Sequence, residues 1–173
     1  MSESRFDREL LGALYAQHQG ELFRYATRYT GDADLAEDIV QEAFMRLAER
    51  PPVDLVAIRA WLYRSVTTIA IDTHRTHRRR GVIAEHRADF LPAPQAGPDP
   101  AAAAEQAEIR VKVHAALEQL DERDRTVLLM REEGFAHREI AEAVGTTTKS
   151  VGTMIARALV KLAQHLDLDG TDV

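Results

Sequence analysis

Cysteine is absent from this chain of 173 residues, so the chain can form neither a disulfide nor a thiolate metal site. The sequence also contains no apolar run long enough to cross a membrane, and its N-terminus does not lead into the apolar core of a signal peptide. Strand signals are scarce, because no alternating β-branched run is followed by a hairpin turn. These absences favour a cytoplasmic, all-α protein that does not insert into a membrane.

Positive charge is also in short supply. The chain has 22 lysines and arginines against 28 aspartates and glutamates, which gives a formal net charge of −6. Such a charge does not by itself predict nucleic-acid binding. Net charge averages over every face of a protein, however, so the local distribution of charge decides whether one face is basic.

The few prolines are concentrated. Four of the six lie within residues 90–100. Proline removes a backbone donor and displaces the preceding residue from the helical region. This stretch therefore predicts a Pro-rich linker over residues 89–104. The linker divides the chain into two small helical domains, one over residues 5–88 and one over residues 105–168.

The N-terminal domain begins with two predicted helices. The first spans about Glu9–Thr30, and Gly31 suits its end. The second spans about Asp34–Glu49, and Asp34 with Glu37 suits a capping box at its start. Apolar residues three and four positions apart form the inward stripe of each helix. In the first helix these are Leu10, Leu14, Leu22, Phe23 and Ala26, and in the second they are Leu35, Ala36, Ile39, Val40, Ala43, Phe44 and Leu47. The opposite face of the second helix is acidic, and solvated surface is the usual role of such a face.

A third helix is predicted after Pro51–Pro52, over about Ala57–Arg79. Its inward stripe comprises Leu62, Val66, Ile69 and Thr73. This helix carries aromatic residues and has a basic end. Its arginines could reach phosphates, because arginine forks suit them, and its aromatic rings could lie beside an unstacked base. A solvated helix end that complements the helix dipole is the alternative. His74 and His77 lie three positions apart, but no carboxylate or thiolate completes a zinc site there. We expect neither a metal nor a cofactor.

The C-terminal domain contains the spacing of a helix-turn-helix, over His137–Leu159. Gly145 suits the left-handed conformation at the end of the first helix, and the Thr147 hydroxyl suits the cap of the second. Four residues are predicted to close the core between the helices: Ile140, Val144, Val151 and Ile155. Lys149, Arg157 and Lys161 make residues 145–162 basic, with no acid among them, as phosphate attraction requires. An ordinary helical hairpin is the alternative interpretation.

Three stretches together resemble bacterial sigma factors. Residues 30–47 resemble their core-polymerase-binding helix. Trp61-Leu62-Tyr63-Arg64, followed by Ala70-Ile71-Asp72 and Arg75, resembles the helix that they use at the −10 promoter element. Ala116–Leu129 with the helix-turn-helix resembles their −35-binding domain. The order of these elements is similar to that of a small, two-domain sigma factor of the extracytoplasmic-function class.

The resemblance implies three sets of site residues and no catalytic residue. Core polymerase, through its β′ and β subunits, would be bound by Asp34, Asp38, Gln41, Glu42, Met45 and Arg46. The −10 element would be bound by Arg59, Trp61, Tyr63, Arg64, Thr68, Arg75, Arg78, Arg79 and Arg80, with the loop from Pro51 to Arg59 capturing a flipped base. The −35 element would be bound by Thr148, Lys149, Ser150, Thr153 and Arg157. The implied partners are core RNA polymerase, promoter DNA and an anti-sigma factor.

The sequence departs from the family at several positions. Thr68 stands where Asn is usual. Gly152 and Met154 stand where many members carry Lys and Arg, which removes two charges from the recognition helix. Ala136 stands where Ser or Thr often caps the first helix of the motif, and a missing cap costs about 1 kcal/mol. These departures affect the −35 contacts more than the fold.

Two other function classes compete with this interpretation. A stand-alone dimeric helix-turn-helix regulator would bind a palindromic site without polymerase. A helical enzyme would need a glycine-rich phosphate loop, a metal spacing or a nucleophile elbow, and the sequence has none of these.

Overall fold

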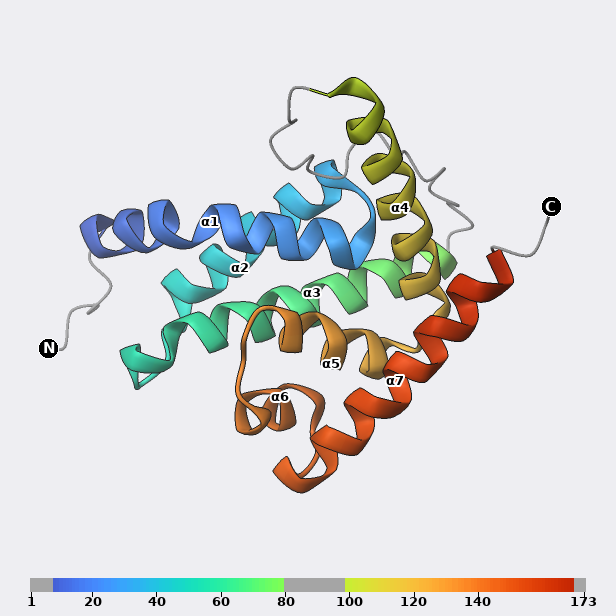
Figure 1. Ribbon diagram of the computed structural model, residues 1–173. Helices are drawn as coiled ribbons and strands as arrows, with labels where there is room; N and C mark the ends of the chain where they lie inside the picture. Colours follow the sequence, from blue (N-terminus) through green and yellow to red (C-terminus); the bar gives the residue numbers. More distant parts are fainter. Residues whose placement is uncertain (1–7, 80–98, 170–173) are drawn as a thin grey trace, which may run out of the picture. The chain divides into compact units, whose positions relative to one another are not determined.

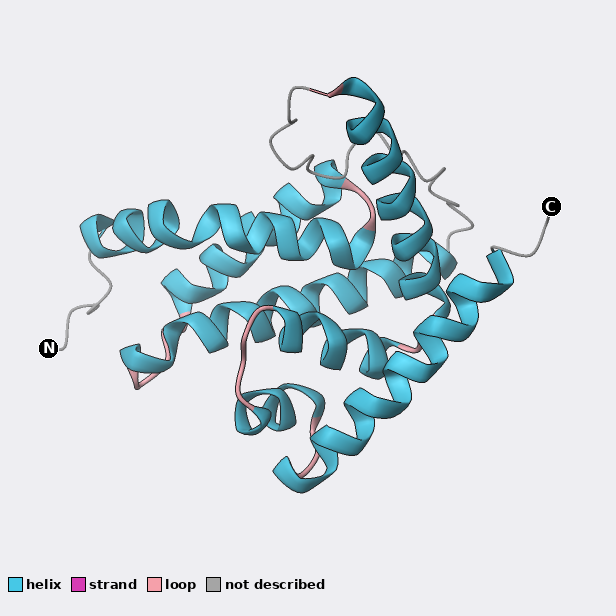
Figure 2. Cartoon of the chain, viewed as in Figure 1, coloured by secondary structure: helices cyan, strands magenta, loops and turns pink. Residues whose placement is uncertain are grey.

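The structure, a computed structural model, describes residues 8–79 and 99–169 (Figure 1). These residues form the helices α1 (Arg8–Thr30), α2 (Ala33–Glu49), η1 (Leu55–Ala57), α3 (Ile58–Arg79), α4 (Pro100–Gln119), α5 (Glu122–Glu132), α6 (His137–Val144) and α7 (Thr148–Asp169). Figure 2 shows only helices and loops in the described part of the chain. The all-α prediction is therefore confirmed.

The chain divides into two compact units, Met1–Phe90 and Leu91–Val173. The division lies inside the predicted linker, but α4 already begins at Pro100, so the prediction is wrong for residues 100–104. The Asp99 side chain caps α4 by accepting a hydrogen bond from the Ala101 N–H at 3.0 Å. Proline is tolerated in the first turn because that turn's N–H groups have no intrahelical partner. The linker residues 89–98 lie outside the described residues.

Three helices, α1, α2 and α3, pack on one another in the first unit. The predicted stripe of α2 is confirmed for Ala36, Ile39, Val40, Ala43, Phe44 and Leu47, all of which are buried. Leu35 is only half-buried. In α1, Leu22 and Ala26 are buried, whereas Leu10, Leu14 and Phe23 are half-buried.

A buried polar contact joins α1 to α3 in this core. Thr67 donates its hydroxyl proton to the Tyr63 carbonyl at 2.8 Å, so the Tyr25 hydroxyl donates to Thr67 at 2.7 Å. The Tyr25 ring also meets the Tyr63 ring edge-on, with 4.9 Å between centroids. Burial raises the pKa of Tyr25 well above its ordinary value, so the hydroxyl stays protonated and can donate.

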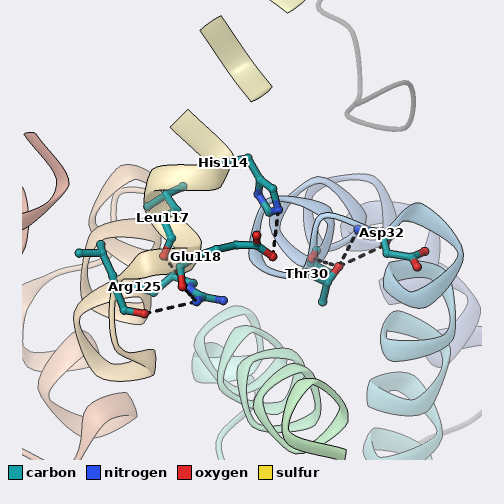
Figure 3. A network of polar contacts seen from close by, with 8 residues as sticks. Thr30, Asp32, His114, Leu117, Glu118 and Arg125 are labelled. Atoms are coloured by element: carbon teal, nitrogen blue, oxygen red, sulfur yellow. Dashed lines mark hydrogen bonds and ion pairs between the residues drawn. The ribbon is translucent and has the colours of Figure 1, made fainter. Parts of the chain in front are cut away.

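The start of α2 differs from the prediction. Asp32, not Asp34, is the N-cap, and its carboxylate accepts from the Leu35 N–H at 3.0 Å. Gly31 takes a φ of 71° directly after the end of α1, as expected, so the two helices are separated by this left-handed glycine and by the extended Asp32. Figure 3 shows Asp32 beside Thr30, whose hydroxyl lies 2.9 Å from the Ala26 carbonyl and 3.1 Å from the Asp32 carbonyl and shares its one proton between these two acceptors. Asp34 therefore lies in the first turn of α2 and faces outward.

In the second unit, α7 packs against α4, α5 and α6. Arg125 of α5 is 3% exposed, and its guanidinium donates to the carbonyls of Leu117, Glu118 and Leu120 at 3.0, 3.0 and 3.3 Å (Figure 3). These carbonyls lie in the last turn and at the C-cap of α4, where carbonyls lack the regular helical donors and where the dipole favours a cation. Arg125 thus closes the corner between α4 and α5.

The helix-turn-helix has the predicted form. Gly145 ends α6 with φ 64° and ψ 50°, and the Thr146 N–H donates to the Ala141 carbonyl at 2.9 Å. Ile140 and Val151 are buried, while Val144 and Ile155 are half-buried. The Thr147 hydroxyl hydrogen-bonds the Ser150 hydroxyl at 2.8 Å, which differs from the predicted bond to the helix backbone.

The start of α6 lacks half of its cap, as the sequence predicts. Ala136 occupies the N-cap in an extended conformation and has no side-chain oxygen to accept a hydrogen bond. Glu139 supplies the other half, because its carboxylate accepts from the Ala136 N–H at 2.9 Å. A serine at position 136 would complete the capping box.

We predict that Ala136→Ser raises the free energy of unfolding of the second unit by about 1 kcal/mol. The check is urea denaturation of the full chain, followed by circular dichroism and by the fluorescence of the single tryptophan, Trp61, which lies in the first unit. The dichroism transition should shift and the fluorescence transition should not. Ala163→Ser, at an exposed position inside α7, is the matched control and should give no gain. Equal gains from both variants would contradict the cap.

Candidate binding surfaces

The outer face of α2 carries all six residues predicted to bind polymerase. Burial of the apolar stripe leaves Asp34, Asp38, Gln41 and Arg46 exposed and Glu42 half-buried. Met45 is 59% exposed on the same side. Arg46 donates to Glu42 at 2.9 Å, so its positive charge is balanced within the face. The face is therefore acidic, with one adaptable apolar side chain in it.

Five of the predicted −10 residues lie together on one face of α3. Trp61 and Arg64 are half-buried, and Thr68, Arg75 and Arg79 are exposed. At 3.6 residues per turn their spacings place all five within a sector of about 60°. The side chains of Arg78 and Arg80 lie outside the described part of the chain.

Tyr63 is a correction to the predicted −10 set. It is fully buried and lies on the opposite side of α3, where its ring contacts Tyr25. Burial, followed by the nearby Glu21 carboxylate, raises the pKa of Tyr63 to about 12. A ring enclosed by α1 cannot lie beside a base, so the aromatic candidate on this helix is Trp61.

Arg59 also stands apart from the α3 face. Its guanidinium donates to the Glu21 carboxylate of α1 at 3.4 Å and lies 4.8 Å from the centroid of the Tyr63 ring. Glu21 is in addition within 2.7 Å of the His18 imidazole. Arg59 therefore has an acidic partner within the chain, which offsets its attraction for phosphate.

The loop before α3 exposes apolar side chains that the predicted site residues do not include. Val53 and Val56 are almost entirely exposed, and Leu55 is 46% exposed. Asp54 caps the short helix η1 by accepting from the Val56 N–H at 2.9 Å. The loop from Pro51 to Arg59 is predicted to capture a base, but the prediction does not name these three side chains. Their position directly after Pro51–Pro52, outside any helical stripe, is the signal that could have identified them.

The outer face of α7 carries the predicted −35 residues. Thr148, Lys149, Thr153 and Arg157 are exposed, and Ser150 is half-buried. Gly152 and Ala156 lie on the same face and are also exposed. The structure thus brings this predicted set together on the second helix of the motif.

Lys161, which the sequence places among the basic residues of 145–162, has its charge balanced within the chain. Its ammonium forms an ion pair with Asp124 and a second with Asp121 at 3.4 Å. The hydrogen bond to Asp124 is the main cause of the raised pKa of Lys161. Lys161 therefore joins α7 to the start of α5, and the exposed cations on the reading face are Lys149 and Arg157.

Two general features of the described residues bear on the function class. No cluster of three or more histidine, aspartate or glutamate side chains within residues 8–79 and 99–169 could hold a metal ion. None of the helices described in these ranges combines the length and the apolarity that a membrane span requires.

Comparisons with known proteins match both units to one family. The family model for Sigma-70 region 2 matches residues 14–80, and that for Sigma-70, region 4 matches residues 110–162. The ECF RNA polymerase sigma factor SigL of Mycobacterium tuberculosis is 35% identical over 91% of this chain and 90% of its own length. The RNA polymerase sigma factor SigV of Bacillus subtilis is 28% identical over 92% of each chain.

Two solved structures share the fold. CnrH, in complex with the cytosolic domain of CnrY, aligns with a TM-score of 0.66 at 23% identity, over 96% of this chain and 93% of that chain. The sigma factor RpoE of Bartonella quintana, in complex with the anti-sigma factor NepR, aligns with a TM-score of 0.59 at 19% identity, over 91% of this chain and 97% of that chain. The sequence matches over nearly the whole chain establish the family that the fold supports. The chain belongs to the extracytoplasmic-function (ECF) class of bacterial RNA polymerase sigma factors, the subunits that direct transcription initiation at promoters.

Proposed function

We propose that the first unit docks on core RNA polymerase through α2 and grips the −10 element through α3, while the second unit binds the −35 element through α7. The observation that supports this proposal most strongly is that acidic and basic side chains lie on different helices of the same unit. The exposed face of α2 is acidic, and the exposed face of α3 carries arginines. One compact unit can then bind a basic protein surface and a polyanion at the same time.

The polymerase contact rests on the six outward residues of α2. Asp34 and Asp38 supply negative charge, Gln41 supplies hydrogen bonds, and Met45 supplies apolar area. The resemblance to the family implies that this helix docks on a coiled coil of the β′ subunit. Glu42 and Arg46, already paired at 2.9 Å, would present a neutral polar contact.

The −10 contact divides between α3 and the loop before it. Arg64, Arg75 and Arg79 would contact phosphates along one side of the helix, and Trp61 would lie beside an unstacked base. Val53, Leu55 and Val56 give the base-capturing loop an apolar surface. An apolar surface favours a base that has left the stack, because the base face is itself apolar.

The chain contributes binding and no reacting group, so it acts as a specificity subunit in the cytoplasm, where polymerase and promoter DNA meet. Phosphate contacts supply most of the affinity of such a subunit, and a few base contacts supply its specificity.

Control by an anti-sigma factor is part of the proposal. The solved structure of RpoE holds the anti-sigma factor NepR, and that of CnrH holds the cytosolic domain of CnrY. An inhibitor that covers α2 or α7 would compete directly with polymerase or DNA. Transcription that is equally strong in normal cells and in cells lacking every candidate inhibitor would contradict sequestration.

We predict that Asp38→Ala combined with Gln41→Ala weakens binding to core polymerase by about tenfold or more, because both side chains are exposed on the proposed docking face. The measurement is a pull-down titration with core polymerase from Mycobacterium tuberculosis, the organism of the SigL relative. Gln17→Ala with Gln19→Ala, both exposed on α1, is the matched control and should bind as the unchanged chain does. A loss of helicity in the α2 variant, without a specific loss of binding, would mean that the face is structural.

A second prediction separates a sigma factor from a dimeric regulator. When random-sequence duplexes are selected with the chain and core polymerase together, two separated, non-palindromic elements should be enriched. The chain alone should enrich little. Enrichment of a palindrome by the chain alone, bound as a dimer, would overturn the proposal.

A further inference from the structure

The reading face of α7 has a gap at Gly152. This glycine is exposed, on the same face as Lys149 and Thr153. A Cβ atom placed on it would have one near neighbour, the Cε1 atom of His137, at 3.8 Å, which is an ordinary van der Waals distance. A side chain is therefore absent where there is room for one, and an imidazole from another helix lies beside the empty position.

His137 reaches this position because it is the first residue of α6, which packs against α7. Its side chain is half-exposed. In helix-turn-helix complexes the second helix enters the major groove while the first crosses the DNA backbone. The imidazole thus lies between α7, the helix that would read bases, and α6, the helix that would cross the phosphate backbone.

The outer face of α7 has few exposed cations, so a further donor to phosphate beside it would contribute to DNA binding. Lys149 and Arg157 are its exposed cations, and Lys161 is held by Asp121 and Asp124. The carboxylate of Glu139, two residues along α6, accepts from the Ala136 N–H. An imidazole N–H is a suitable donor to a phosphate oxygen.

We propose that His137 contacts a backbone phosphate of the −35 element and takes the place of the contact that a long side chain at position 152 would make. His137 is then a DNA-binding residue supplied by α6, next to the recognition helix. The inference rests on the proposed entry of α7 into the major groove.

The test uses the full chain assembled with core polymerase, and a duplex recovered from the selection described above. We expect His137→Ala to weaken binding about tenfold or more, the size of one hydrogen bond to a charged group. His137→Gln keeps a side-chain donor and should recover part of the loss. His165→Ala, at a half-exposed histidine near the other end of α7, is the matched control and should change nothing. Circular dichroism checks that each variant is folded.

Two further measurements locate the contact. Replacement of single phosphates by uncharged methylphosphonates should reveal one position that weakens the unchanged chain but not His137→Ala. Gly152→Lys, combined with His137→Ala, should restore affinity and steepen the log–log dependence of binding on salt by about 0.9.

The outcomes separate this inference from the function on which it rests. If the unchanged holoenzyme enriches no −35-type element, the proposed function fails and His137 is not at issue. If the unchanged chain binds the element and His137→Ala binds it equally well, or if both respond to the same methylphosphonates, the His137 contact is overturned. A loss of binding together with a loss of helicity would also overturn it, because His137 would then act in folding.

Discussion

Every helix in this chain leaves backbone groups at its ends without intrahelical partners, and the way in which those groups are satisfied organises both units. Aspartates at Asp32, Asp54, Asp99 and Asp121 accept hydrogen bonds from the first turns of α2, η1, α4 and α5. Gly31 and Gly145 end α1 and α6 in the left-handed region. At the end of α4, Arg125 takes up three carbonyls at once. These contacts set where each helix begins and where the chain turns, so they determine how each apolar stripe meets its core.

A second constraint is the pairing of opposite charges within the chain. A net charge of −6 would repel DNA if it were spread evenly. The structure shows several charges balanced internally: Arg46 with Glu42, Arg59 with Glu21, and Lys161 with Asp121 and Asp124. The exposed faces also differ in charge: acidic side chains predominate on the outer face of α2, and arginines predominate on one face of α3, which also exposes Asp72. This difference, and not the net charge, makes the chain suited to a protein partner and a nucleic acid together.

The second unit combines a regular fold with an unusual reading face. Ala136 leaves α6 half-capped, and Gly152 leaves α7 without a side chain at an exposed position. Neither change disturbs the core, because Ile140, Val151 and Ala158 remain buried. The family fold is therefore kept while the DNA contacts are free to differ, and His137 is the side chain that the structure places next to the difference.

Features that depend on local sequence rules could be predicted without the structure. The stripe of α2, the end of α6 at Gly145 and the missing cap at Ala136 were predictable, because each depends on periodicity or on the conformational preference of one residue. The three outward faces followed from the same periodicity together with the family resemblance. Their roles in binding stay predictions, since no partner is present to test them.

Only the tertiary structure decided which side chains have partners from other helices. Trp61 and Tyr63 are two residues apart, and Tyr63 is the buried one because its ring packs against Tyr25 of α1. Lys161 counts as a basic residue in the sequence, yet Asp121 and Asp124, some forty residues earlier, take up its charge. Gly152 and His137 become neighbours only when α6 packs on α7. Sequence periodicity shows which way a residue faces on its own helix, whereas the partner that it meets depends on how the helices pack, and that packing rests on contacts between residues far apart in the chain.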